Sequence, residues 1–250
     1  MTDVCAFCGY EGDNFDPEHW IPDWLSRKLI PKYGSMVGHI AKDGSVIPRR
    51  RFEITVPHVC RPCNGGWMSD IETRTSSNGD LLRLVLGVSE PPLTRERQTD
   101  LATWGFLKAL TAELARPEDQ IETYPREMYE QFKRDKKPPL KSCSIALGFR
   151  TIPGTEPDPI FAWSRSQGQN FPVHERGIDG GASGTETGYL TTILIGHLVI
   201  DVAGLLRPFD DANLDHGEGW YSPLWPSLPG EDFPWPPQKH FAGVADDDLY

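Results

Sequence analysis

The chain has 250 residues, of which 38% are apolar and 10% aromatic, enough for a substantial core in one large or two small domains. Its formal net charge of −11 argues against a protein that coats nucleic acid through its overall field. Ten of the acidic side chains lie within residues 201–250, so the charge does not exclude a phosphate-binding N-terminal part. No apolar run reaches the roughly twenty residues that a membrane span requires.

Two CxxC pairs stand far apart in the sequence. The first is Cys5 and Cys8 in CAFCG, and the second is Cys60 and Cys63 in CRPCNGG. Each pair can form a knuckle, a tight turn that lets two thiolates meet one zinc ion, and two knuckles complete a tetrahedral site with four cysteine ligands. The spacing therefore predicts a structural zinc site.

The cysteines allow two other interpretations. Paired disulfides need an oxidising compartment, and the first residues, MTDVCAFCGYEGD, contain no apolar signal segment. A redox CxxC usually follows a strand at the start of a helix, whereas the first pair is followed by Gly and acidic loop residues. Cys143 remains as an odd cysteine. We therefore expect zinc ligation in a reducing cytoplasm.

The segment between the knuckles predicts a short helix and a hairpin. Residues 22–30 have Pro22 early and apolar side chains at helical spacing. Residues 36–56 contain two strand-like runs around an Asp-Gly turn signal at 43–44. The second knuckle then leads into a helix that includes Trp67 and Ile71.

After residue 76 the pattern changes to longer helices and then to strands. Residues 94–116 are the clearest helix, with Thr94 as its N-terminal cap, and a second helix is expected at 125–136 behind Pro125. Other expectations are a short apolar helix or strand at 79–88, strands at 142–151, 158–166 and 188–206, a loop at 177–188, and an irregular Pro- and Trp-rich tail.

Together these elements predict an α+β protein with two parts. Residues 1–76 would form a zinc-ribbon ββα domain, in which a hairpin and a helix are held by zinc. Residues 77–250 would form an α+β region with a helical segment, a small antiparallel sheet and an acidic C-terminal segment.

The order C-x-x-C, then Glu18-His19-x-x-Pro22, then C-x-x-C-Asn64 followed by a helix resembles the HNH endonucleases, and in particular their zinc-ribbon-supported ββα-metal branch. The resemblance covers about residues 5–75. It implies a metal-dependent nuclease with a ββα-metal fold.

The resemblance also implies roles for individual residues. His19 would be the general base that takes a proton from the attacking water, which is a poor nucleophile at neutral pH. Glu18 and Asn64 would bind a catalytic Mg²⁺ or Mn²⁺ that stabilises charge on the phosphate. Because these hard oxygen ligands differ from thiolates, the catalytic ion and the zinc should occupy different sites.

One element of the family pattern is missing. The Asn that orients the base histidine is expected shortly before the second knuckle, where this chain has FEITVPHVC. Thr55, His58 or a backbone carbonyl could take its place. Glu72 is a further candidate ligand, although a solvated helix position is the more common role for such a glutamate.

The expected function is therefore an HNH-type endonuclease that hydrolyses DNA. Arg49, Arg50 and Arg51 are the best candidates for phosphate contacts, or else form a solvated strand edge. A homo-oligomer is possible, and no membrane partner is expected. The alternative is a zinc-ribbon module on a degenerate nuclease fold that binds nucleic acid or protein without cutting, as the missing Asn and the acidic charge would favour.

Overall fold

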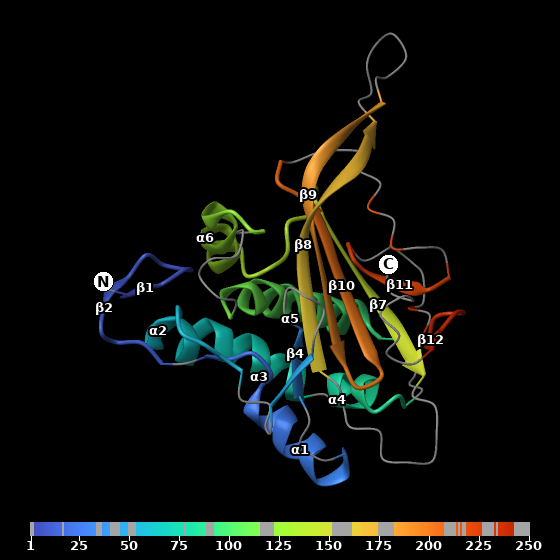
Figure 1. The fold of residues 1–250 in the computed structure, drawn as a ribbon, viewed down its shortest axis with the longest axis horizontal. Helices are drawn as coiled ribbons and strands as arrows, with labels where there is room; N and C mark the ends of the chain where they lie inside the picture. Colours follow the sequence, from blue (N-terminus) through green and yellow to red (C-terminus); the bar gives the residue numbers. More distant parts are fainter. Residues whose placement is uncertain are drawn as a thin grey trace.

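The fold is described from a computed structural model of the chain. The residues that it describes are 3–16, 18–33, 37–40, 46–49, 54–77, 79–88, 93–115, 123–151, 162–174, 183–207, 214, 216, 219–226, 233 and 235–242. Figure 1 shows a sheet crossed by helices on one side, with β1 and β2 far from the sheet and the N-terminal strand β4 beside β8.

The N-terminal part contains three small antiparallel strand pairs. They are β1 (Asp3–Val4) with β2 (Glu11–Gly12), β3 (Glu18–His19) with β6 (Thr55–Val56), and β4 (Val37–Ile40) with β5 (Val46–Arg49). The predicted helix after His19 is confirmed as α1 (Asp23–Tyr33), which buries Leu25 and Leu29 completely.

The predicted hairpin is confirmed by the pairing of β4 with β5, and its turn lies outside the described residues. The prediction of one continuous second strand up to residue 56 was wrong. Residues Thr55–Val56 pair with Glu18–His19 instead, so that α1 and the hairpin are inserted between the two strands β3 and β6.

The helix after the second knuckle begins at the knuckle itself. It runs through α2 (Arg61–Cys63), a π-helical segment η1 (Asn64–Met68) and α3 (Ser69–Ser77), and the short helix α4 (Asp80–Val85) follows. The backbone at Gly66 departs from helical geometry, with φ −103° and ψ −115°. A local irregularity of this kind suits the Gly65-Gly66 pair, because glycine has little preference for helix interiors.

The long helix α5 (Arg95–Leu114) is confirmed, and Thr94 caps it by accepting a hydrogen bond from the backbone N–H of Arg97. Almost every residue from Leu101 to Glu113 is buried, so this helix passes through the interior instead of lying on the surface with one apolar face. Helix α6 (Arg126–Asp135) is also confirmed and starts directly after Pro125.

Five antiparallel strands form the main sheet in the order β11-β7-β10-β9-β8. Their bounds are β7 (Cys143–Thr151), β8 (Ala162–His174), β9 (Ser183–Ile195), β10 (Leu198–Leu205) and β11 (Tyr221–Trp225); β12 (Phe241–Ala242) pairs in parallel with β7. Strands β8 and β9 extend past the others as a two-stranded ribbon (Figure 1). The expected α+β class and small antiparallel sheet are therefore present.

Three details of this region differ from the prediction. The single run 188–206 is two strands, because Gly196 adopts a left-handed conformation (φ +60°) and turns the chain at His197. Residues 183–188, expected in a loop, belong to β9, where backbone pairing with β8 compensates for their weak strand preference. The tail, expected to be irregular, contributes β11 to the edge of the sheet.

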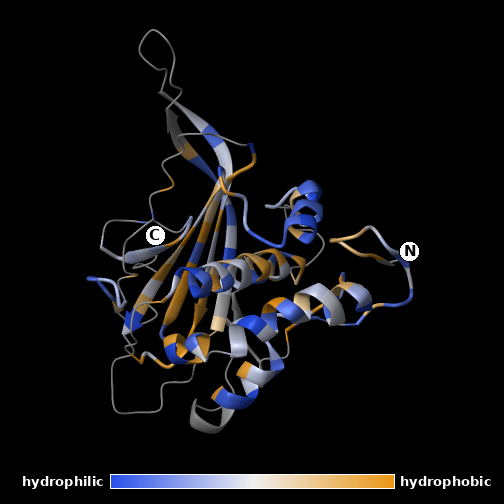
Figure 2. Ribbon diagram, turned by 180° about the vertical axis from the view of Figure 1, so that it is seen from behind, coloured by the Kyte–Doolittle hydropathy of each residue, from blue (hydrophilic) through white to orange (hydrophobic). Residues whose placement is uncertain are grey.

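A single large apolar cluster joins the two parts of the chain. Helix α5 crosses one face of the sheet, where a Cβ on Gly105 would lie 3.2 Å from Ile200 Cγ2. Hydrophobic residues lie along both this helix and the strands (Figure 2), and the buried ones belong to one cluster. The cluster also includes Cys5, Trp20 and Ile71 from the N-terminal part. The division at residue 76 stays a prediction, and the core is continuous across it. None of the described helices has the length and apolarity needed to cross a membrane.

Candidate metal centre and the neighbouring histidine

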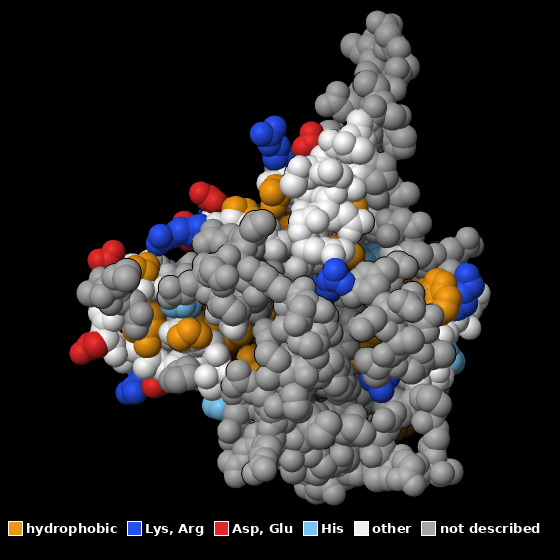
Figure 3. Space-filling view, viewed as in Figure 1, with side chains coloured by type: hydrophobic (Ala, Val, Ile, Leu, Met, Phe, Trp, Pro, Cys, Tyr) orange, Lys and Arg blue, Asp and Glu red, His pale blue; other side chains and the backbone are white. Residues whose placement is uncertain are grey.

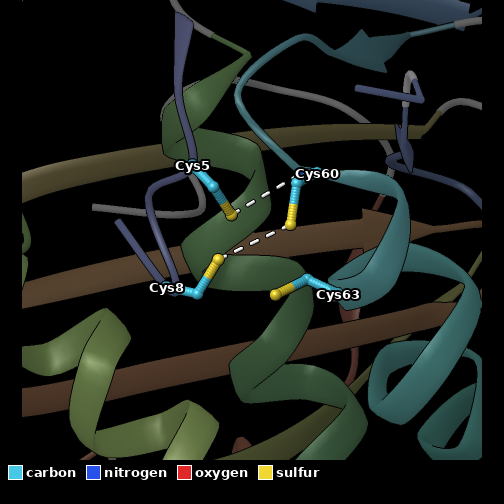
Figure 4. Close-up of side chains that lie close together, drawn as sticks. All are labelled: Cys5, Cys8, Cys60 and Cys63. Atoms are coloured by element: carbon cyan, nitrogen blue, oxygen red, sulfur yellow. Dashed lines mark hydrogen bonds between the residues drawn. The ribbon is translucent and has the colours of Figure 1, made fainter. Parts of the chain in front are cut away.

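The two knuckles meet in space. The sulfur atoms of Cys5, Cys8, Cys60 and Cys63 all lie within 4.8 Å of one another, and the four side chains point to a common centre (Figure 4). The Sγ atoms of Cys8 and Cys60 are 3.5 Å apart. A tetrahedral zinc ion with Zn–S bonds of about 2.3 Å would separate its sulfurs by about 3.8 Å, so the donor set fits zinc in type, number and spacing.

Local turns hold each knuckle. In the first, the Gly9 N–H donates to the Cys5 carbonyl at 2.9 Å, and Gly9 has φ +68°, a conformation that side chains disfavour. In the second, the N–H groups of Cys63 and Asn64 both donate to the Cys60 carbonyl at 3.0 Å. The Ala6 N–H donates to the His58 carbonyl at 3.1 Å and joins the two turns.

The close approach of the thiols sets their protonation. A hydrogen bond from Cys63, opposed by burial, lowers the pKa of Cys5 to about 4, and burial raises the pKa of Cys60 to about 11. The pKa of Cys63 is raised further, chiefly by its hydrogen bond to Cys5. One thiolate is thus stabilised by protonated neighbours. A divalent cation at the centre would favour the thiolate form of all four.

Aromatic side chains connect the metal centre to helix α6. Phe7, between the first two cysteines, is fully buried and makes edge contacts with Trp67 at 5.4 Å and Tyr129 at 5.3 Å between ring centroids. Trp67 in turn contacts Phe132 at 5.7 Å. The centre is therefore packed against the rest of the chain, and all five cysteines are free of disulfides.

His19 lies at the end of strand β3 with its side chain exposed. Thr55 is its direct partner on β6 and is exposed on the same face, so the two side chains are cross-strand neighbours. Of the residues considered as substitutes for the missing Asn, Thr55 is the one whose strand register places it beside His19. The His58 backbone belongs to the knuckle contacts instead.

Glu18 does not lie beside the imidazole. Successive side chains of a strand point to opposite faces, and the Glu18 side chain is buried where that of His19 is exposed. Its Oε1 atom lies 2.9 Å from the ammonium of Lys108, a fully buried lysine of helix α5. We expected Glu18 to bind a catalytic ion next to His19; the structure gives this carboxylate a buried cation as its partner.

Asn64 lies close to the segment that precedes His19. Its amide nitrogen is 3.4 Å from the carbonyl oxygen of Asp16, so the amide oxygen is the atom that could serve as a ligand. The Asp16 carboxylate accepts two hydrogen bonds from Arg61, at 2.7 and 2.9 Å. Acidic and basic side chains are interspersed at the end of the molecule formed by these N-terminal elements (Figure 3).

Lys108 and its link to Glu72 were not anticipated from the sequence. The ammonium lies 2.6 Å from Glu72 Oε1, so Glu72, considered above as a metal ligand or a solvated residue, pairs with the same buried cation. The available signal was a lysine within the apolar run of 101–114, where a helix buried on all sides would need a partner for it.

Arg50 and Arg51 lie outside the described residues, and of Arg49 the structure describes the backbone in β5.

The four cysteines form the one group of three or more His, Cys, Asp or Glu side chains within the described residues that is placed to hold a metal ion. The predicted zinc ligands thus come together, whereas Glu18 lies on the opposite face of β3 from His19 and Asn64 lies near the segment that precedes His19. Comparisons of the chain with protein-family models, with curated proteins and with solved structures found no match.

Proposed function

We propose that the chain is a metal-dependent endonuclease of the HNH type that hydrolyses phosphodiester bonds in DNA, with His19 as the general base. The observation that carries the proposal is the order of elements around the metal centre. Strand β3 presents His19 to solvent, β6 pairs with it antiparallel, and the helix starting at the second knuckle follows directly. An antiparallel strand pair followed by a helix supports the ββα arrangement that the resemblance implies.

In this proposal the exposed imidazole of His19 takes a proton from the water that attacks the phosphate. A base of this kind contributes about 10²- to 10⁴-fold to the rate when it is correctly oriented. The Thr55 hydroxyl, across the strand pair, is the group nearest in register to orient the ring. The zinc centre fixes both ends of the frame, because one knuckle precedes β3 and the other follows β6.

A requirement for Mg²⁺ or Mn²⁺ remains part of the proposal. When bound, such an ion would stabilise charge on the phosphate and on the leaving oxygen. Because Glu18 is engaged by Lys108, we leave it out of the ligand set. In this chain the proposed ligands of the ion are His19 and the amide oxygen of Asn64. Oxygens of the phosphate itself would complete the ligand set.

The test is a nicking assay on supercoiled plasmid with Mg²⁺ or Mn²⁺. We expect the zinc-loaded protein to convert plasmid to the open form and His19→Ala to lose at least about 100-fold in rate. The matched control is His240→Ala, which removes an exposed histidine far along the chain whose ring lies tilted against Phe149. A wild-type protein that never nicks, or a His19→Ala variant that nicks equally well, would contradict the proposal.

DNA as the substrate and Arg49, Arg50 and Arg51 as its phosphate contacts also remain proposals. Replacing the three arginines with glutamine should weaken plasmid binding about equally for all sequences. It should also reduce the dependence of binding on salt, since each phosphate contact releases counterions. A homo-oligomer is a further possibility that sedimentation would test.

The second candidate is a binding module that does not cut. The observation that favours it is the burial of Glu18 against Lys108, which leaves the exposed face of His19 without the predicted carboxylate. Metal analysis separates the two candidates. Zinc alone, with DNA binding unaffected by added Mg²⁺, favours the binder; a second divalent ion whose binding is lost in His19→Ala favours the nuclease.

A further inference from the structure

The middle of helix α5 brings one cation to the inner side of the ββα frame. The ammonium of Lys108 lies 2.9 Å from Glu18 Oε1, 2.6 Å from Glu72 Oε1 and 3.2 Å from the backbone carbonyl oxygen of His19. The contacts to Glu18 and to the His19 carbonyl are hydrogen bonds, and the contact to Glu72 is an ion pair. Glu18 and His19 belong to strand β3, and Glu72 belongs to helix α3. The proposed site needs these two elements in a fixed position relative to each other.

The same residue holds β3 a second time through its backbone. The indole nitrogen of Trp20 donates to the carbonyl oxygen of Lys108 at 3.1 Å. Lys108 therefore contacts three consecutive residues, from Glu18 to Trp20. Strand β3 itself consists of two residues and pairs only with β6, so within the described residues this contact is a major part of what fixes its position.

Burying the Lys108 ammonium costs free energy of desolvation, so packing alone does not explain the residue at this position. The side chain is fully buried, and burial alone would favour the neutral amine; the charges of Glu72 and Glu18 outweigh it, so the pKa of Lys108 is raised. Replacing a buried ion pair by apolar residues is often neutral or stabilising. A gain in stability therefore does not by itself account for the arrangement, whose contacts join strand β3 to helix α3.

We propose that Lys108 is a positioning residue of the His19 site: by binding Glu18, Glu72 and the His19 carbonyl from inside, it sets the register of β3 on α3 and thereby the direction of the exposed imidazole. The proposal rests on the proposed function. It also gives the region after residue 76 a defined role, because α5 supplies the part that completes the N-terminal frame.

The test compares three zinc-loaded, full-length variants. Lys108→Met removes the cation and keeps the shape of the side chain. The triple variant Lys108→Met/Glu18→Gln/Glu72→Gln also neutralises both carboxylates, so that no charge is left unpaired. Lys137→Met, at an exposed lysine after α6, is the matched control. Two readouts are needed: plasmid nicking with separate kcat and KM, and the NMR cross-peak between the His19 ring and the Thr55 methyl group, which reports their proximity without requiring activity.

We expect both Lys108 variants to lose about 10- to 100-fold in kcat with little change in KM, because a small misplacement of a reacting group costs rate before it costs binding. The His19–Thr55 cross-peak should weaken in both and persist in Lys137→Met. If Lys108→Met does not fold, the triple variant decides the question alone.

A folded triple variant with the cross-peak and kcat of the wild type would overturn the proposal, because the register would then not depend on the cation. If the wild type itself never nicks plasmid, the proposed function fails. The cross-peak still decides whether Lys108 sets the position of His19, so the two failures are distinguishable.

Discussion

The side chains of Glu18 and His19 leave strand β3 on opposite faces: the carboxylate reaches inward to the ammonium of Lys108 at 2.9 Å, and the imidazole faces solvent beside Thr55. Two adjacent residues therefore serve two different environments. One anchors the strand to the interior, and the other is exposed to solvent. Several consequences of this division can be measured.

Removal of the inward carboxylate should destabilise the fold. In Glu18→Ala the ammonium keeps Glu72 but loses its other charged partner in a buried site, and we expect a loss of about 2–4 kcal/mol in the free energy of unfolding. Glu127→Ala, at an exposed position of α6, should stay within about 0.5 kcal/mol of the wild type. Denaturant unfolding measures both. Equal stability of Glu18→Ala and the wild type would show that the ion pair does not contribute.

The metal centre should hold one zinc ion per chain, and the fold should depend on it. Cys63→Ser is expected to lose zinc, because the site needs four thiolates, whereas Cys143→Ala should retain it. Because thiolates must be deprotonated to bind metal, zinc should be released as the pH falls. Elemental analysis and thermal unfolding with and without chelator check this. Zinc retained by Cys63→Ser would count against the assignment.

Thr55 should affect catalysis more than stability. Thr55→Val keeps the shape of the side chain and removes the hydroxyl that lies across from His19, and we expect about a tenfold loss in nicking rate, as for other groups that orient a histidine. Thr185→Val, an exposed threonine of β9, is the matched control. Wild-type activity in Thr55→Val would remove Thr55 from consideration as the substitute for the missing Asn.

Cys143 should make the protein sensitive to alkali. Burial raises the pKa of its thiol from 9.0 to about 12, so the folded state holds this proton more tightly than the unfolded state. Its contribution to stability is complete below pH 9 and is lost as the pH rises toward 12, at about 1.4 kcal/mol per pH unit. Cys143→Ala should show a shallower decline over that range. Unfolding curves at several pH values test this, and parallel declines in both proteins would refute it.

The turn between β9 and β10 should tolerate no side chain. Gly196 has φ +60°, and a Cβ there would lie 2.5 Å from the backbone oxygen of Val85. We expect Gly196→Ala to cost about 1–3 kcal/mol in the free energy of unfolding. Gly168→Ala, where the nearest atom to an added Cβ is 4.0 Å away, is the control. A smaller loss in Gly196→Ala than in Gly168→Ala would contradict the described turn.

Much of the local structure could be predicted because its causes are local. The spacing within each CxxC pair, the cap at Thr94 and the Asp-Gly turn signal each depend on a few neighbouring residues, and the cysteine cluster, α5 and the β4–β5 hairpin are all present. Residue chemistry also indicated that the four thiols share one metal site, although the two pairs are more than fifty residues apart in the chain.

The remaining features depend on contacts that no local pattern encodes. The partner of Glu18 lies 90 residues further on, and Lys108 is buried because α5 is covered on all sides by the sheet and the N-terminal elements. Strand β9 includes Gly- and Thr-rich residues that extend only because β8 lies alongside them. The pairing of β6 with β3 also could not be predicted from local patterns, because α1 and the β4–β5 hairpin separate the two strands in the sequence.

The contacts of Phe7 with Trp67 and Tyr129 join the candidate metal centre to the interior of the whole chain. Loss of the ion would loosen the first knuckle and, through the Phe7 ring, the apolar cluster to which the strands of the sheet also contribute.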